Sequence, residues 1–137
     1  MSKFSTLQKF TIILMVAFAG LAAYWFMHGG SGSHSRVAVT KSLVAAKKLS
    51  VACRAYALDH EGNFPPSLDA LFPAYLTDRS ALVSPLMPAE PVGYLYTPGG
   101  KYTGPVNAVV IEDKFASLQH LRIVAYVDGS ARVLTPP

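Results

Sequence analysis

The feature that most constrains this chain is an uncharged apolar run near its N-terminus, residues 10–27, FTIILMVAFAGLAAYWFM. Its 18 residues come close to the roughly 20 that a helix needs to cross the hydrocarbon core of a bilayer. Lys3 and Lys9 precede the run, and Trp25 lies near its far end, where aromatic rings favour the membrane interface. We therefore expect a membrane anchor over residues 1–28, with a cytoplasmic N-terminus.

A cleaved signal peptide is the alternative interpretation of this run. Ala17, Phe18 and Ala19, followed by Gly20, fit the small-x-small pattern of a cleavage site. The apolar run continues as far as Met27, which favours a retained anchor. A buried core helix fits less well, because the run has no hydrophilic face.

The rest of the chain is expected to form one soluble domain, residues 36–137, after a linker over residues 29–35. Three glycines within GGSGS favour a flexible break. A helix then begins near Ser35 and ends near His60, because glycine and proline follow closely. Its apolar positions recur at helical spacing: Val39, Leu43, Ala46, Leu49, Cys53 and Tyr56.

After this helix the sequence predicts a short helix capped by Ser67, a loop over residues 77–91, and then strands. The expected strands cover residues 92–97, 107–111, 122–127 and 130–134. Asp128 and Gly129 join the last two strands, and we expect a two-residue hairpin turn with positive φ at both positions. The fold class is therefore α+β, with a helix packed on a small antiparallel sheet of three to four strands.

Composition excludes several classes of function. The single cysteine, Cys53, rules out an intrachain disulfide and any zinc or iron–sulfur site built on cysteines, and we expect it to be buried. The net charge of +4 comes from basic residues that are scattered along the chain. They do not form the basic stripe that is typical of a nucleic-acid-binding protein. No P-loop, Gly-x-Ser-x-Gly or dinucleotide-binding motif occurs in the sequence.

Titratable residues give only weak catalytic or metal candidates. Asp59 and His60 are adjacent on a helix and point about 100° apart, so a helix end with an imidazole at the negative dipole fits better than a catalytic pair. Glu112, Asp113 and Asp128 offer oxygen ligands to calcium, but without the spacing of an EF-hand. We interpret them as solvated loop carboxylates, and we predict no catalytic, cofactor or metal site.

The stretch from Lys47 to Leu76 resembles the type IV pilin-like proteins, or pseudopilins, most closely those of planctomycetes and verrucomicrobia. The resemblance rests on a Tyr-x-x-Asp-His-x-Gly-x-Phe-Pro pattern followed by Leu-x-x-Leu, and on a closing strand, Asp-Gly, strand. The matching residues here are Tyr56, Asp59, His60, Gly62, Phe64, Pro65, Leu68, Leu71, Asp128 and Gly129.

The N-terminus is similar to the prepilin motif of this family in a degraded form. Family members carry Gly-Phe-Thr-Leu-x-Glu before the apolar run, and here Phe10 and Thr11 match. Lys9 stands where the peptidase requires glycine, and Leu14 replaces the glutamate that pairs with a neighbouring subunit's amine. The resemblance therefore implies a chain that is neither cleaved nor methylated at Phe10.

The function that the resemblance implies is a structural or accessory subunit of a type II secretion or type IV pilus-like assembly. Such a protein is a single-pass protein of the inner membrane with its domain in the periplasm, and it contacts other pilin-like subunits through its N-terminal helix. The alternative is a membrane-tethered binding module that reuses the fold without polymerising. The departures at Lys9 and Leu14 favour this alternative.

Overall fold

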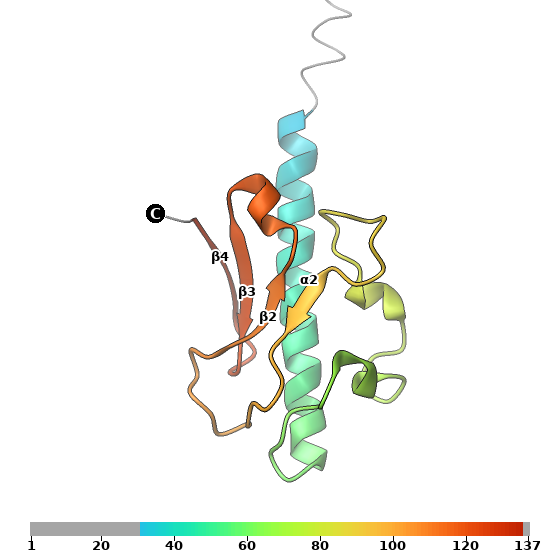
Figure 1. The fold of residues 1–137 in the computed structure, drawn as a ribbon, viewed down its shortest axis with the longest axis vertical. Coiled ribbons are helices and arrows are strands. Elements are labelled where there is room, and N and C mark those ends of the chain that lie inside the picture. Colours follow the sequence, from blue (N-terminus) through green and yellow to red (C-terminus); the bar gives the residue numbers. More distant parts are fainter. Residues whose placement is uncertain (1–30, 136–137) are drawn as a thin grey trace, which may run out of the picture. The chain divides into compact units, whose positions relative to one another are not determined.

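The computed structural model describes residues 31–135, with side chains from residue 35 onward. These residues have an α+β fold that consists of one long helix, α2 (Ser31–Asp59), and a four-stranded antiparallel sheet. The strands run along the length of α2, and the chain from Arg36 onward forms one compact unit (Figure 1). The expected fold class is thus confirmed for this part of the chain, whereas the expected anchor lies outside it.

The start of α2 differs from the expectation. The helix begins at Ser31, whereas the sequence predicted a flexible segment up to residue 35. A glycine within a helix costs about 1 kcal/mol relative to alanine, but each residue added to an existing helix gains a hydrogen bond. A helix of 29 residues therefore accommodates Gly32 near its first turn.

The predicted apolar stripe of α2 packs on the sheet. Its central members Ala46, Leu49 and Cys53 are fully buried, and its outer members Val39, Leu43 and Tyr56 are partly buried against the same core. Burial raises the pKa of the Cys53 thiol to about 12, so this cysteine behaves as a small apolar core residue, as expected.

The sheet contains β1 (Tyr94–Tyr96), β2 (Val109–Asp113), β3 (Arg122–Tyr126) and β4 (Ala131–Leu134), in the order β1-β2-β3-β4. Every strand pairs antiparallel with its neighbour in sequence. All four predicted strands are present, with ends within two residues of those expected.

The β3–β4 hairpin is confirmed, but its turn is of a different type. Gly129 N donates to Tyr126 O at 3.0 Å, and Gly129 has φ +84° while Asp128 does not have positive φ. Ala125 pairs with Ala131, so the loop is longer than two residues. A β-turn followed by one left-handed glycine is the usual three-residue solution, and it requires only one residue with positive φ.

Three short 3₁₀ helices lie in the connections: η1 (Leu68–Leu71), η2 (Arg79–Leu82) and η3 (Ala116–Gln119). Ser67 precedes η1, but its side chain makes no capping hydrogen bond. The segment expected to be a plain loop contains η2, which is capped by Asp78 accepting from Ser80 N at 2.8 Å.

Candidate functional site

The pattern residues from Tyr56 to Pro65 gather around the C-terminal end of α2, whereas Asp128 and Gly129 lie in the β3–β4 turn. The rings of Tyr56 and His60 stack with centroids 3.7 Å apart, and His60 Nδ1 lies 2.8 Å from the carbonyl oxygen of Tyr56. The Tyr75 hydroxyl donates to Asp59 Oδ2 at 2.8 Å, and this hydrogen bond raises the pKa of Tyr75. These contacts hold the last turn of α2 against the segment that follows η1.

Asp59 and His60 therefore bind different groups, as their adjacent helical positions predicted. Asp59 accepts from the Tyr75 hydroxyl, whereas the His60 imidazole contacts the backbone one turn earlier. An imidazole at this end of a helix interacts favourably with the partial negative charge of the carbonyl groups. This geometry stabilises a helix end, and it does not give His60 a carboxylate that orients it as a general base.

Gly62 closes the helix. Gly62 N donates to Ala57 O at 2.8 Å, and both Glu61 and Gly62 have positive φ, +55° and +79°. A left-handed residue just after a helix lets the next N–H groups reach the carbonyl groups of the last turn. Glycine adopts this conformation without steric cost, which explains its place in the pattern.

Phe64 and Pro65 join this helix end to the connection between β1 and β2. Phe64 is only 5% exposed, and its N–H donates to Gly100 O at 2.9 Å. The Tyr96 hydroxyl donates to Pro65 O at 2.6 Å. A Cβ on Gly100 would lie 3.1 Å from the Phe64 ring, so the glycine permits the close contact. The pattern residues therefore fix the turn after α2 to the edge of the sheet.

A buried polar cluster lies at the other end of the same interface. Ser42 from α2 and Ser84 from the loop after η2 both donate to Oδ2 of Asp113, the latter at 2.6 Å. Phe115 N donates to Oδ1 at 2.7 Å, and the Tyr94 hydroxyl lies 3.2 Å from Ser42 Oγ. Burial raises the pKa of Tyr94 to about 12.

This cluster is enclosed and fully hydrogen-bonded. Ser42, Ser84 and Asp113 are at most 4% exposed, and within residues 35–135 no buried side-chain nitrogen or oxygen lacks a partner. A Cβ on Gly93 would lie 2.4 Å from Ser84 N, so the backbone closes over the cluster. The group therefore forms a buried, hydrogen-bonded polar link between α2, β1 and β2.

This cluster was not predicted from the sequence. The interpretation of Asp113 as a solvated loop carboxylate is wrong. Glu112 and Asp113 were expected to be solvated loop carboxylates, yet both lie on β2. Successive strand residues point to opposite faces, so Asp113 shares the inward face with Ile111. The β-branched run of residues 109–111 is followed directly by Glu112 and Asp113. Extending the predicted strand by these two residues would have placed Asp113 on it.

The carboxylates considered for calcium do not come together. Glu112 receives two hydrogen bonds from Arg122, at 2.8 and 2.9 Å, and this bidentate pair lowers the pKa of Glu112. In the hairpin turn, hydrogen bonds from the Ser130 side chain and from Ser130 N, the latter at 2.8 Å, lower the pKa of Asp128. Among the described residues, no group of three or more His, Cys, Asp or Glu side chains is placed to hold a metal ion.

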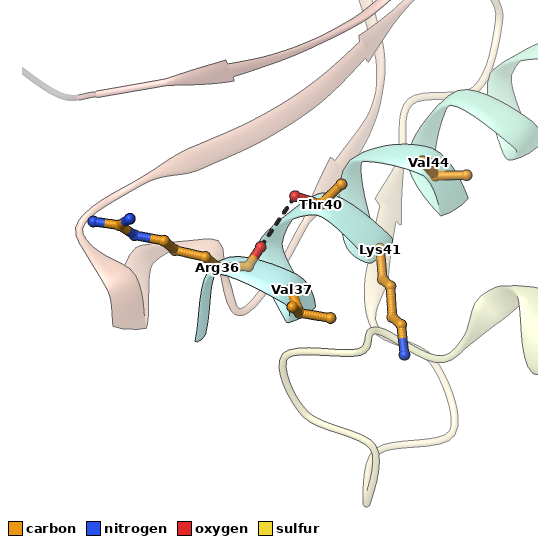
Figure 2. A pocket seen from close by; sticks show the side chains of 5 residues that line it. All are labelled: Arg36, Val37, Thr40, Lys41 and Val44. Carbon is orange, nitrogen blue, oxygen red and sulfur yellow. Dashed lines mark hydrogen bonds between the residues drawn. The ribbon is translucent and has the colours of Figure 1, made fainter. Parts of the chain in front are cut away.

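The side of α2 that faces away from the sheet carries an exposed apolar line. Val37, Val44, Val51 and Leu58 recur every seven residues and are between 48% and 67% exposed. Figure 2 shows the N-terminal part of this side, where a hollow of about 400 Å³ is lined by Arg36, Val37, Thr40, Lys41 and Val44. We call the surface formed by Val37, Lys41, Val44, Lys48, Val51, Ala55 and Leu58 the outer face of α2.

Comparison with known proteins returned no match: no protein-family model, no curated protein and no solved structure matches this chain. Within residues 31–135, no helix combines the length and the apolar character needed to span a bilayer. Lys9, Phe10, Thr11 and Leu14, the residues of the degraded prepilin motif, lie outside the described residues, as does the expected anchor.

Proposed function

We propose that this chain is a membrane-anchored, pilin-like accessory subunit of a type II secretion or type IV pilus-like assembly. In this proposal residues 10–27 hold the chain in the inner membrane, and the domain that follows lies on the periplasmic side. The protein has a structural role and carries out no reaction.

The observation that carries the proposal is the arrangement of the pattern residues. Tyr56, Asp59 and Gly62 close a long helix, and Phe64 and Pro65 tie its end to the connection after β1. The part of the sequence pattern from Tyr56 to Pro65 thus forms one structural unit, and the Asp128-Gly129 part forms the β3–β4 turn. One long helix followed by a consecutive antiparallel sheet is also the layout that the resemblance implies.

An accessory role suits this N-terminus better than the role of a repeating subunit. A charged group in a membrane helix is costly unless it is paired, and in the family the glutamate pairs with the free amine of a cleaved neighbour. Leu14 and Lys9 remove both halves of this pairing. Apolar helix packing in lipid still allows association with other subunits, but it specifies register weakly.

Co-purification with a major pilin-like subunit tests the proposal. The full chain should co-purify with that subunit from detergent-solubilised membranes, and deletion of residues 10–27 should abolish this. A matched control replaces residues 10–27 with an unrelated apolar anchor of equal length, which keeps the domain at the membrane. Loss of association in both variants is expected, and failure of the full chain to co-purify would contradict the proposal.

A tethered binding module is the second candidate, favoured by the same departures at Lys9 and Leu14. Near the β3–β4 turn, a hollow of about 300 Å³ is lined by Val106, Asn107, Tyr126, Asp128, Ser130 and Arg132. Its mixed polar lining suits a small polar group on a partner. Ligand binding that is lost in Asn107→Ala, together with no association with pilin-like subunits, would favour this module.

A further inference from the structure

The outer face of α2 combines exposed apolar side chains with charge of only one sign. Five basic residues lie on the helix between positions 36 and 54, and no acidic residue occurs between Ser31 and Leu58. Along the outer face, Lys41 and Lys48 alternate with Val37, Val44 and Val51. The stripe that packs on the sheet lies on the opposite side of the helix, so the domain leaves most of this face exposed, and Val51 has the β3–β4 turn at Gly129 beside it.

A second helix is a poor occupant of this face. A coiled-coil seam requires apolar residues three or four positions after each apolar residue, whereas Lys41 and Lys48 stand at these places. A dry interface would bury their ammonium groups without partners, which is costly.

A second copy of the chain is excluded by the same charges. Parallel helices would place Lys41 and Lys48 against their own equivalents. Antiparallel helices would place Lys41 and Lys48 against the outer face of the second copy, where no acidic residue occurs before Asp59. Like charges facing each other at an interface destabilise it.

We propose that the outer face of α2 lies on an anionic lipid surface. Valine and leucine side chains enter the boundary of the acyl chains, while the lysine stems extend along it and bring their ammonium groups to lipid phosphates. The inference rests on the membrane anchor of the proposed function. The uncharged run ends at Met27, only four residues before α2 begins, so a bilayer lies within reach of this helix.

Fluorescence quenching in vesicles tests this surface on the full chain. The protein carries an environment-sensitive fluorophore on Val44→Cys and is reconstituted into vesicles of phosphatidylcholine, with or without phosphatidylglycerol, that contain a headgroup-quencher lipid. Cys53 is fully buried and its thiol is protonated at neutral pH, so it stays unlabelled. A matched control carries the label on Leu95→Cys, which is exposed on β1 and whose neighbours Tyr94 and Tyr96 face the core.

Lipid docking predicts that the label at position 44 is quenched in the phosphatidylglycerol vesicles and released by 0.5 M salt, whereas the label at position 95 stays unquenched. Each lysine near an anionic surface shifts the docking equilibrium roughly fivefold, so Lys41→Gln with Lys48→Gln should weaken docking roughly 25-fold. Lys101→Gln with Lys114→Gln removes equal charge elsewhere and should leave quenching unchanged.

Equal exposure of the two labels in both vesicle types overturns the inference. The label at position 44 could instead become shielded from solvent as the protein density in the vesicles rises, without being quenched by lipid. This result also overturns the inference, and it indicates a protein neighbour. Carbonate extraction of the same vesicles reports the anchor separately. A chain that stays in the pellet with an unquenched label 44 contradicts only this inference, and a chain that is extracted contradicts the proposed anchor.

Discussion

The hydroxyl of Ser84 donates a hydrogen bond of 2.6 Å to Asp113, and the two residues are 29 positions apart in the chain. Both are buried, and the same carboxylate oxygen also accepts from Ser42 on α2. Neither of the two ion pairs among the described residues involves Asp113. The carboxylate is therefore held by hydrogen bonds alone, and it joins the helix, the loop after η2 and β2 at one point.

Replacing Asp113 with alanine should destabilise the domain by about 3 kcal/mol, because two buried hydroxyl groups and Phe115 N–H lose their acceptor. Urea denaturation measures the change. Asp69→Ala removes a carboxylate whose ion pair with Arg79 is exposed, and it should leave the free energy of unfolding unchanged within error. Equal effects of the two substitutions would show that the buried cluster does not link these elements.

This cluster marks the limit of what the sequence predicts. The stripe through Ala46, Leu49 and Cys53 was predictable, because helical period alone decides which residues face a core. The strands were predictable from β-branched runs and the Asp128-Gly129 turn signal. Ser42 carries no such signal, since a serine on a helix becomes buried only when a partner from a distant segment arrives.

The site at the end of α2 was predictable as a pattern but not as a set of contacts. The glycine after the helix indicated where the helix ends, and in the structure Gly62 closes the helix with positive φ. Asp59 accepts a hydrogen bond from Tyr75, and Pro65 accepts one from Tyr96. The periodicity of the sequence gives no indication that these residues meet. Such pairings depend on the tertiary arrangement, which local sequence does not encode by itself.

Phe64→Ala should cost about 3 kcal/mol in a chain that begins at His34, because the ring is almost completely buried beside Gly100. Leu118→Ala, at a side chain that is 61% exposed, provides the control and should change little. Chemical denaturation gives both values. A loss of less than about 0.5 kcal/mol for Phe64→Ala would refute its role in fixing the helix end.

The Glu112–Arg122 pair should make stability depend on pH. The hydrogen bonds from Arg122 lower the folded-state pKa of Glu112, so its contribution is present above the unfolded pKa and disappears as the pH falls through the folded pKa. Glu112→Gln should therefore be less stable than the wild type at about pH 6, by less than about 1 kcal/mol, and equal to it at about pH 2. A difference that persists unchanged at the lower pH would contradict this assignment.

The N-terminal motif predicts that the chain is not processed. Lys9 presents a long charged side chain where prepilin peptidase requires a small residue, so intact-mass measurement should find no cleavage before Phe10 and no methylated Phe10. Introducing the residues of the pilin-like family with Lys9→Gly and Leu14→Glu should make the chain a substrate of the peptidase. An N-methylphenylalanine start on the wild-type chain would overturn the prediction and restore the standard pilin pathway.

We propose that this protein joins a pilin-like assembly without building one by itself. The most direct measurement is the composition of filaments sheared from cells that express the protein alone or together with a major subunit. We expect no filaments from cells that express the protein alone, and a minor amount of the protein within filaments of the major subunit. Filaments made of this protein alone, or its absence from mixed filaments, would contradict the accessory role.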